Sequence, residues 1–500
     1  MMRPLVLPAL LVAFSLVAQQ APPAAATRLS LQGAIETSLK NNLQVQLATE
    51  TRRSTVAGVM VEQGAFDWNL SSALSLSKTQ DATRYQGLGG GFTTLDGTVQ
   101  SRSLTVGSTK AFEWGGNLAL SYAPKYSFAS GSYYGGSTTT PYDGSLSATY
   151  TQSLLRNFGR EATESRLIVA RLGAQSADYT FQLAIINLVA STESQYWDVV
   201  YAQRNLGNKQ QALELAQKQL NENQIRVQVG TLAPIEVTSS EASVAQAEQD
   251  IITAEAALAN AKDALIRALY PGAERPAGLE LTDAPTLSHS NLAEAAAENM
   301  AMERRVELKS ARIDLQAKQS LEVAAKNRTL PQLDAFATYS GNAASQIASE
   351  GIAAVNKDLA KAAYPGYAIG LQFSIPIQNR AAKGSLAQAR ASTRSSELTL
   401  QDQELAIRLQ VRQAIRTIEA AEKGVKAAEK TRIFREKDLD AEKKKFENGM
   451  STNFLVLSKL NDLNTAKGNE LQAQISYAKG VTALEQAVGN LLEARKLVVK

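Results

Sequence analysis

The pattern of apolar and polar positions changes between two periods along this chain, and the same change occurs in both halves. A helical period, with apolar residues every three or four positions, predicts three helical segments in each half. These are 31–63, 160–228 and 234–269, then 292–328, 380–447 and 454–495. Between the first two segments of each half lie regions 66–155 and 332–377, where apolar and polar residues alternate, which predicts strands.

The shared order of elements indicates an internal repeat. Gly230 aligns with Gly449 at the same offset that aligns Val237 with Val456. We therefore divide the chain into a first repeat, 27–285, with a helical hairpin at 160–269, and a second repeat, 286–500, with a hairpin at 380–495. Alanines also align at this offset, as Ala254 does with Ala473, and shared helical composition would explain them. It does not explain the paired glycines.

The two long helical segments need partners. A helix of about seventy residues is roughly 100 Å long and requires packing along its length. One seam alternates steps of four and three residues, as in a coiled coil: Ile407, Val411, Ala414, Ile418, Ala421, Val425 and Ala428. The charged faces fit either solvated outer surface or the lining of a water-filled lumen.

Each long helix ends at a glycine, within VGTLAPIEV (229–237) and NGMSTNFLV (448–456). Glycine readily takes the left-handed conformation at a helix end, so we expect it at Gly230 and Gly449. Pro234 suits the first position of the next helix, and Thr452 or Asn453 can cap the matching one.

The alternating segments fit a membrane β-barrel with a wet interior. Trp68, Tyr122, Tyr126 and Tyr150 would suit aromatic girdles at the membrane boundaries. A soluble antiparallel sheet with an aromatic core fits the same composition. One chain supplies too few strands to close a barrel, and open edges are not tolerated in lipid, so a barrel would need a ring of identical chains.

The N-terminus has the features of a secretory signal. Arg3 precedes an apolar run from Leu5 to Ala18, and small residues follow, so we expect a signal peptide at 1–26, cut after Ala18 or Ala26. An N-terminal membrane helix is the alternative, but the run is short for a span. No later run of eighteen apolar residues occurs.

Composition excludes several classes of function. The chain has no cysteine, so it forms no disulfide, and its net charge of +4 gives no reason to propose nucleic acid as a partner. His289, the single histidine, lies in a predicted linker, and no GxSxG motif accompanies it. The run GLGGGF (87–92) lacks the Lys-Ser/Thr of a phosphate loop. We predict no enzyme activity, no metal and no cofactor.

An ordered set of segments resembles the TolC-like outer-membrane efflux proteins. The set comprises LSLQGAIETSLKNNLQVQLA, ESQYWDVVYAQRNL, VGTLAPIEVTSSEA, RVELKSARIDLQAKQSLEVAAKNRTLPQLDAFATYS, the junctions TQSLLRNFGR and GLQFSIPIQNR, and KKFENGMSTNFLVLSKLNDLNTA. The resemblance covers nearly all of the mature chain. It implies a mainly α fold with membrane β: a homotrimer with one shared transmembrane β-barrel and a periplasmic α-barrel of coiled-coil helices.

The resemblance also implies a function and a location. The chain would be a passive exit duct in the outer membrane of a Gram-negative-type envelope, surrounded by outer-membrane lipid. It would work with an inner-membrane transporter and a periplasmic adaptor, in a tripartite efflux pump or a type I secretion system. The alternatives are a periplasmic or surface coiled-coil structural protein and a pump adaptor.

By position, the resemblance places adaptor contacts at the two glycine turns. They are Val229, Gly230, Thr231, Leu232, Asn448, Gly449, Met450 and Ser451. The glycines also make the turns, and both roles are compatible. Family members carry entrance-narrowing acids after the second turn, where this chain has Leu455 and Ser458. Glu236 could supply a ring instead and Phe454 an apolar constriction, against the alternative of ordinary packing or solvated positions.

A second departure lies in the first strand region. The family usually has two strands per repeat, whereas 103–126, with AFEWGG at its centre, reads as an additional hairpin. If this hairpin joins the wall, a trimer has eighteen strands instead of twelve. Otherwise it folds over the mouth or into the lumen.

Overall fold

The computed structural model describes residues 27–86, 89–131, 142–272, 276, 278–285, 293–347 and 349–497. The expected signal peptide and His289 lie outside the described residues. The chain forms two compact units. Unit 1 takes its described residues from 1–45, 185–297 and 411–500, and unit 2 from 46–184 and 298–410.

The helices of the first repeat largely follow the sequence pattern, with two interruptions. They are α1 (Leu31–Asn41), α2 (Leu43–Gln63), α3 (Arg160–Thr163), α4 (Ser165–Gln228) and α5 (Ile235–Leu269). The single helix expected over 31–63 is broken at Asn42, whose backbone is extended. Its side chain stabilises the break, because Oδ1 accepts from the Gln44 amide (2.7 Å) and Nδ2 donates to the Ala268 carbonyl (2.9 Å).

The second repeat has the same plan. Its helices are α6 (Glu294–Arg304), α7 (Val306–Asn327), α9 (Arg380–Glu447), α10 (Asn453–Val488) and α11 (Leu491–Ala494). Here the expected first helix is broken at Arg305. When the starts of the two repeats are aligned, Ala48 pairs with Ala311, and the same offset pairs Asn42 with Arg305. The last segment is interrupted at Gly489, which adopts a left-handed conformation (φ +82°).

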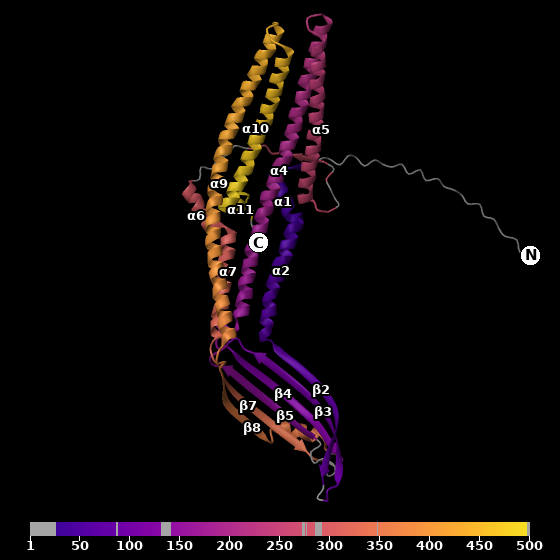
Figure 1. Cartoon of the computed structure of the whole chain (residues 1–500), viewed down its shortest axis with the longest axis vertical. Helices are drawn as coiled ribbons and strands as arrows, with labels where there is room; N and C mark the ends of the chain where they lie inside the picture. Colours follow the sequence, from indigo (N-terminus) through magenta and orange to yellow (C-terminus); the bar gives the residue numbers. More distant parts are fainter. Residues whose placement is uncertain are drawn as a thin grey trace, which may run out of the picture. The chain divides into compact units, whose positions relative to one another are not determined.

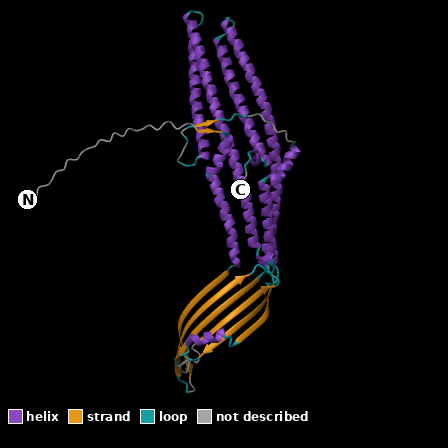
Figure 2. Ribbon diagram, turned by 180° about the vertical axis from the view of Figure 1, so that it is seen from behind, coloured by secondary structure: helices purple, strands orange, loops and turns teal. Residues whose placement is uncertain are grey.

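The sheet of unit 2 is a six-stranded antiparallel meander (Figures 1 and 2). Its strands are β2 (Trp68–Gln86), β3 (Phe92–Ala111), β4 (Gly116–Ser130), β5 (Tyr142–Ser153), β7 (Gln332–Ser345) and β8 (Pro365–Ser374). The order is β2-β3-β4-β5-β7-β8, so both repeats build one sheet. Strands from the two repeats meet between β5 and β7, where Thr149 and Thr338 are paired.

The additional hairpin joins the sheet. It forms β3 and β4, which lie between β2 and β5, and it does not fold away from them. Its turn is closed by a hydrogen bond from the Phe112 amide to the Gly116 carbonyl (2.8 Å). Gly115 has φ +93°, and a Cβ there would lie 2.2 Å from the Asn157 carbonyl oxygen, which explains the glycine.

The two faces of the sheet differ in polarity. Register places Leu74 beside Leu104, Tyr122 beside Leu146, and Ala337 beside Ile369 on one face. The opposite face pairs Ser121 with Ser147, Ser147 with Ser340, and Thr149 with Thr338. Because side chains alternate along each strand, one face is apolar and the other is rich in hydroxyl groups.

A short helix, α8 (Gly351–Ala360), follows β7 and packs on the apolar face of the sheet. The sequence pattern did not predict it. A second unpredicted element is a two-stranded parallel sheet in unit 1, formed by β1 (Thr27–Leu29) and β6 (Leu279–Leu281). Three residues per strand are too few to show a period.

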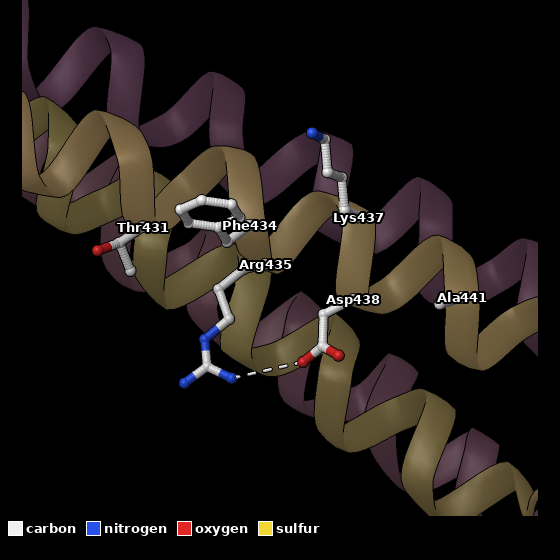
Figure 3. Close-up of a pocket in the computed structure, with 6 residues that line it drawn as sticks. All are labelled: Thr431, Phe434, Arg435, Lys437, Asp438 and Ala441. Carbon is white, nitrogen blue, oxygen red and sulfur yellow. Dashed lines mark ion pairs between the residues drawn. The ribbon is translucent and has the colours of Figure 1, made fainter.

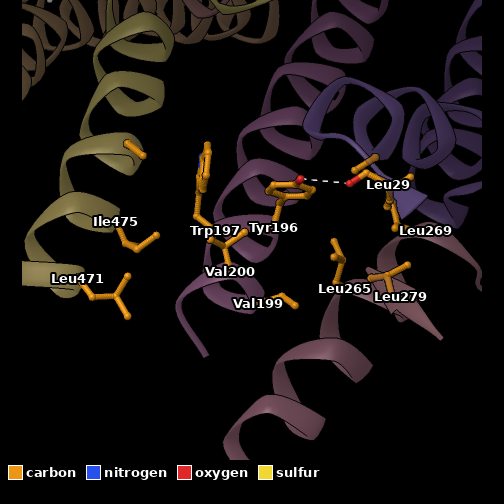
Figure 4. Close-up of a cluster of buried hydrophobic side chains, with 12 residues drawn as sticks. Leu29, Tyr196, Trp197, Val199, Val200, Leu265, Leu269, Leu279, Leu471 and Ile475 are labelled. Carbon is orange, nitrogen blue, oxygen red and sulfur yellow. Dashed lines mark hydrogen bonds between the residues drawn. The ribbon is translucent and has the colours of Figure 1, made fainter. Parts of the chain in front are cut away.

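The core of unit 1 gathers residues from α4, α5, α10 and the small parallel sheet (Figure 4). Tyr196 is fully buried at its centre, and its hydroxyl donates to the Leu29 carbonyl (3.1 Å). Trp197 meets Tyr196 edge to face, with 5.5 Å between ring centroids. This core ties the N-terminal strand to the helices that carry the glycine turns.

Candidate functional site: the two hairpin tips

The first glycine turn, which we call tip 1 (229–232), ends α4 with a Schellman motif. The Thr231 amide donates to the Arg226 carbonyl (2.9 Å), and the Gly230 amide donates to the Val227 carbonyl (3.0 Å). Gly230 has φ +78°, as the sequence predicted. Pro234 precedes α5 with helical dihedral angles, so the missing proline amide costs no hydrogen bond.

The second turn, tip 2 (448–451), has the same backbone. The Met450 amide donates to the Lys445 carbonyl (2.8 Å), and the Gly449 amide donates to the Phe446 carbonyl (3.1 Å). Gly449 has φ +74°. Thr452 then caps α10, its side chain accepting from the Leu455 amide (3.4 Å). The two repeats therefore build equivalent tips.

The predicted contact residues fall into two groups. Val229, Thr231 and Met450 are exposed, with Val229 67% and Met450 71% accessible, as are Gly230, Asn448 and Gly449. Leu232 is half-buried instead, because it packs against the apolar cluster of Leu439, Phe446, Val456, Leu460 and Leu463. Leu232 therefore anchors tip 1, and the other six residues are accessible.

Ser451, the remaining contact residue, is engaged within tip 2. Its hydroxyl donates a short hydrogen bond to the carboxylate of Glu442, which is itself buried. Lys445 Nζ lies 3.3 Å from the other oxygen of that carboxylate. The Ser451 hydroxyl and then Lys445 hold the pKa of Glu442 below its usual value.

Asn453 lies in a buried polar network directly beneath the tips. It is 1% exposed, and its Oδ1 accepts from Asn223 Nδ2 (2.7 Å) and Gln219 Nε2 (3.3 Å). Its Nδ2 donates to Ser240 Oγ (3.3 Å) and to the Glu236 carboxylate (3.1 Å). This amide network therefore joins α4, α5 and α10, and so links the two hairpins.

A second link between the hairpins lies beside the amide network. The Arg226 guanidinium carbon lies 4.4 Å from the centroid of the Phe446 ring, and Arg226 Nη1 lies 3.5 Å from the Phe446 carbonyl. Arg226 also supplies the carbonyl that closes tip 1. The conformation of tip 1 is thus coupled directly to α9.

The two candidate constriction residues behave differently. Glu236 is half-buried, and its carboxylate accepts a hydrogen bond from Asn453. Phe454 is 69% exposed and does not join the apolar cluster beneath the tips. Phe454 is therefore an exposed aromatic side chain beside tip 2, whereas Glu236 already serves the amide network.

The sequence reading missed the amide network, although a signal for it exists. Four buried residues of α4 follow the four-three-four spacing of a seam: Ala212, Ala216, Gln219 and Asn223. The last two are polar at positions where apolar residues are expected. Polar residues within a seam predict buried hydrogen bonds, so Gln219 and Asn223 could have been predicted to form them.

A shallow groove of about 530 Å³ runs along the α9 surface of unit 1 (Figure 3). It is lined by Thr431, Phe434, Arg435, Lys437, Asp438 and Ala441. Arg435 lies 3.1 Å from Asp462 of α10, and Lys459 lies 3.0 Å from Asp438, so ion pairs join the two helices of this hairpin. Phe434 stands exposed beside them. The groove is too open to enclose a small molecule.

Neither metal nor membrane-helix features occur in the described part of the chain. No group of three or more His, Cys, Asp or Glu side chains there is arranged to hold a metal ion. Among the same residues, no helix combines the length and apolarity needed to cross a membrane.

Comparison with known proteins agrees with this architecture. The sequence profile of the family described as outer membrane efflux protein matches residues 34–269 and 298–490. No curated protein matches the sequence. Among solved structures, the fold is similar to the outer membrane protein VceC of Vibrio cholerae, with 15% identity and a TM-score of 0.67 over 92% of this chain and 96% of that one.

Two further channels have the same fold. The MtrE outer membrane channel of Neisseria gonorrhoeae, in its open state, is 17% identical with a TM-score of 0.63, covering 92% of this chain and 89% of MtrE. The CmeC outer membrane channel of Campylobacter jejuni is 14% identical with a TM-score of 0.63, covering 92% and 86%. The family profile spans most of both repeats, and the chain belongs to the outer membrane efflux protein family, whose members are TolC-like channels of the Gram-negative outer membrane.

Proposed function

We propose that this protein is the passive outer-membrane exit duct of a tripartite efflux pump or a type I secretion system, as a homotrimer. An inner-membrane transporter would supply the energy, and a periplasmic adaptor would connect the two. The observation that carries the proposal is the pairing of two equivalent glycine-tipped hairpins with a two-faced sheet in one chain of this family. The family favours this function over a coiled-coil structural protein or an adaptor.

The polarity of the sheet supports a membrane wall around a wet lumen. The apolar face would meet lipid, and the hydroxyl-rich face would line the pore. Aromatic residues lie at both ends of the apolar stretch: Trp68 shares a register row with Tyr150, and Tyr126 pairs with Tyr142. Leu118 and Tyr126 lie in these two rows. On a tilted strand they are about 20 Å apart along the membrane normal. That height suits the apolar core of an outer membrane.

The sheet edges support assembly from several chains. Within the described chain, β2 and β8 each have one hydrogen-bonded neighbour, which leaves one edge of each strand open. Open edges cannot remain in lipid, so we propose that β8 of one copy pairs with β2 of the next. Three six-stranded sheets would then close an eighteen-stranded barrel.

Helix α2 gives independent support for the trimer. None of its residues is buried within this chain. Met60 and Val61 are 73% and 75% exposed. One stripe of α2 packs within this chain, where Arg52 bonds to Asp178 (2.6 Å), and we propose that the exposed remainder of its surface contacts a second copy. The groove beside Phe434 on α9 offers a further contact surface of the same kind.

The tips would form the periplasmic entrance. The exposed apolar side chains Val229 and Met450 suit docking of adaptor hairpins, together with the neighbouring residues of tips 1 and 2. Phe454 would narrow the entrance, and the Asn453 amide network would hold the hairpins in the closed arrangement. Glu236 would act mainly within that network and less as a free acidic ring.

The first test combines the oligomer mass with single-channel conductance of the purified mature protein in a planar bilayer. We expect a trimer with discrete openings. A folded trimer that stays silent should open after Asn453→Ala, which weakens the amide network between the hairpins. A soluble monomer that conducts in neither form would contradict the duct.

A further inference from the structure

Helix α8 lies on the side of the sheet that we assign to lipid. Val355 and Leu359 are buried against Ala343 of β7, with Tyr122 and Tyr142 packed around them. The Tyr122 hydroxyl donates to Asn356 Oδ1 (2.5 Å). Tyr122 and Tyr142 occupy the apolar face, since Tyr122 pairs with Leu146 and Tyr142 with Tyr126. Helix α8 is thus held against the apolar face of the sheet by apolar packing and by one side-chain hydrogen bond.

Glycine makes room for this helix. A Cβ at Gly144 would lie 2.8 Å from Val355 Cγ1 and 3.3 Å from Leu359 Cδ1. Gly144 lies between Pro124 of β4 and Ala343 of β7, so small or flat residues form a shallow seat across three strands. The sequence of the sheet is therefore adapted to α8, which is not a loosely attached loop.

The seat lies at one end of the apolar stretch. Tyr142 begins β5, and Ala343 is near the end of β7, away from the residues that connect these strands to α3 and α7. The register row of Tyr142 continues through Tyr126 to Arg102 of β3. Helix α8 therefore lies where the apolar face gives way to polar side chains.

Basic side chains lie on α8 and, farther across the same face of the sheet, on β2 and β3. Lys357 and Lys361 are exposed one helical turn apart, on the side of α8 away from Val355 and Leu359. Arg102 and Lys78 are exposed on the same face of the sheet, and the Arg102 guanidinium carbon lies 5.8 Å from the Tyr126 ring. No carboxylate of the described chain lies within ion-pair distance of these four side chains.

The acidic groups of the α8 segment are placed differently. Glu350 precedes α8, and its carboxylate accepts a hydrogen bond from Ser345 Oγ (3.2 Å). Asp358 is half-buried. The exposed charge on the outer side of the helix is therefore positive, next to exposed Ile352 and Ala353.

We propose that α8 is an interfacial helix and that Lys357, Lys361, Arg102 and Lys78 bind the phosphate groups of lipids at the outer boundary of the membrane. The proposal rests on the proposed barrel, because only then does this face meet lipid. Charge complementarity and continuity with the apolar wall identify the occupant: an anionic lipid whose chains lie along the wall while its phosphates meet the basic residues. In an outer membrane the fitting lipid class is a phosphorylated glycolipid.

The test uses full-length trimer in phosphatidylcholine nanodiscs with and without lipid A, and native mass spectrometry of the retained lipid A. Each lysine near an anionic surface contributes about 1 kcal/mol, so Lys357→Gln with Lys361→Gln should lower retention about thirtyfold. Lys125→Gln is the matched control, because Lys125 is equally exposed but lies on the hydroxyl-rich face. The proposal is overturned if the double lysine variant and the Lys125→Gln control retain lipid A equally. It is also overturned if inorganic phosphate displaces lipid A equally well from the wild-type trimer and from the double lysine variant.

The absence of cysteine allows a second readout that does not depend on lysine. A fluorophore on Ile352→Cys should be quenched by lipids brominated near the headgroup, whereas one on Ser147→Cys, which faces the lumen side, should not. Quenching of the Ile352 label by aqueous iodide alone would overturn the interfacial position. Conductance should be unchanged in the lysine variants, so loss of the lipid site is distinguishable from failure of the duct.

Discussion

Asn223 and Asn453 are 230 residues apart in the chain, yet their side-chain amides meet at 2.7 Å, both buried. This bond joins the helix that leads to tip 1 to the helix that leaves tip 2. Buried amides are costly when unpaired, so the contact specifies one arrangement of the hairpins. Any opening of the tips that separates α4 from α10 must break it.

Asn453→Ala should therefore destabilise the closed tips. It removes one acceptor each from Asn223 and Gln219, which keep Ser240 Oγ and Asn223 Oδ1 as acceptors, so we expect a cost of about 1 kcal/mol. We expect larger or more frequent single-channel openings and a lower melting temperature. Asn448→Ala is the control. Asn448 is exposed, and its side-chain amide donates to the Lys444 carbonyl in the last turn of α9 and takes no part in the amide network. Identical single-channel recordings from both variants would contradict the proposal that the Asn453 amide network holds the tips closed.

Replacing a tip glycine with alanine should change stability in the opposite direction from replacing a glycine inside a helix. Gly449→Ala should cost about 1–2 kcal/mol because of its positive φ alone, since no atom lies within 4 Å of the added Cβ. Gly424 lies inside α9, the helix that ends before Gly449, with equally open space but without positive φ, so Gly424→Ala should stabilise by about 1 kcal/mol. Thermal unfolding of the two variants should shift in opposite directions.

Ser451→Ala should change the pH response of tip 2. The Ser451 hydroxyl depresses the pKa of Glu442, so this bond stabilises the folded tip at pH values above the unfolded pKa. That stability is lost as the pH falls through the lowered folded pKa. Removing the hydroxyl should raise the pKa of Glu442, measured by carbon NMR of labelled glutamate, and move acid opening of the tip to higher pH. An unchanged Glu442 titration would refute the coupling.

The two faces of β8 provide a test of which side meets lipid. Ile369→Arg should destabilise the inserted protein by about 2–4 kcal/mol if Ile369 faces the bilayer, whereas Ala368→Arg should be tolerated on the lumen side. Urea unfolding in bilayers measures both. Comparable penalties at the two neighbouring positions would argue against a two-faced wall.

Charge on α2 should prevent assembly without unfolding the single chain. Met60→Glu with Val61→Glu places two carboxylates on a surface that is largely exposed in this chain but that we expect to contact a second copy. Native mass spectrometry should show loss of trimer. Ser54→Glu adds charge to an exposed polar position of the same helix and should leave the trimer intact. A stable trimer in the first variant would remove α2 from the interface.

The long helices, the glycine tips and the strand regions could be predicted from the sequence, because each has a local cause. Helical and strand periods are set by neighbouring side chains, and a glycine such as Gly230 marks a backbone that other residues take at a cost. The sequence did not reveal the break at Asn42, which is stabilised by the distant Ala268 carbonyl.

Which polar residues are buried, and what covers each face of the sheet, could not be predicted, because both depend on packing between distant parts of the chain. Gln219 and Asn453 look like surface residues until α4 and α10 are brought together. Helix α8 could be recognised as part of the wall only when register placed Gly144 beside Ala343. The reason is physical: periodicity records which side of an element is apolar, but the partner of a side chain depends on long-range packing.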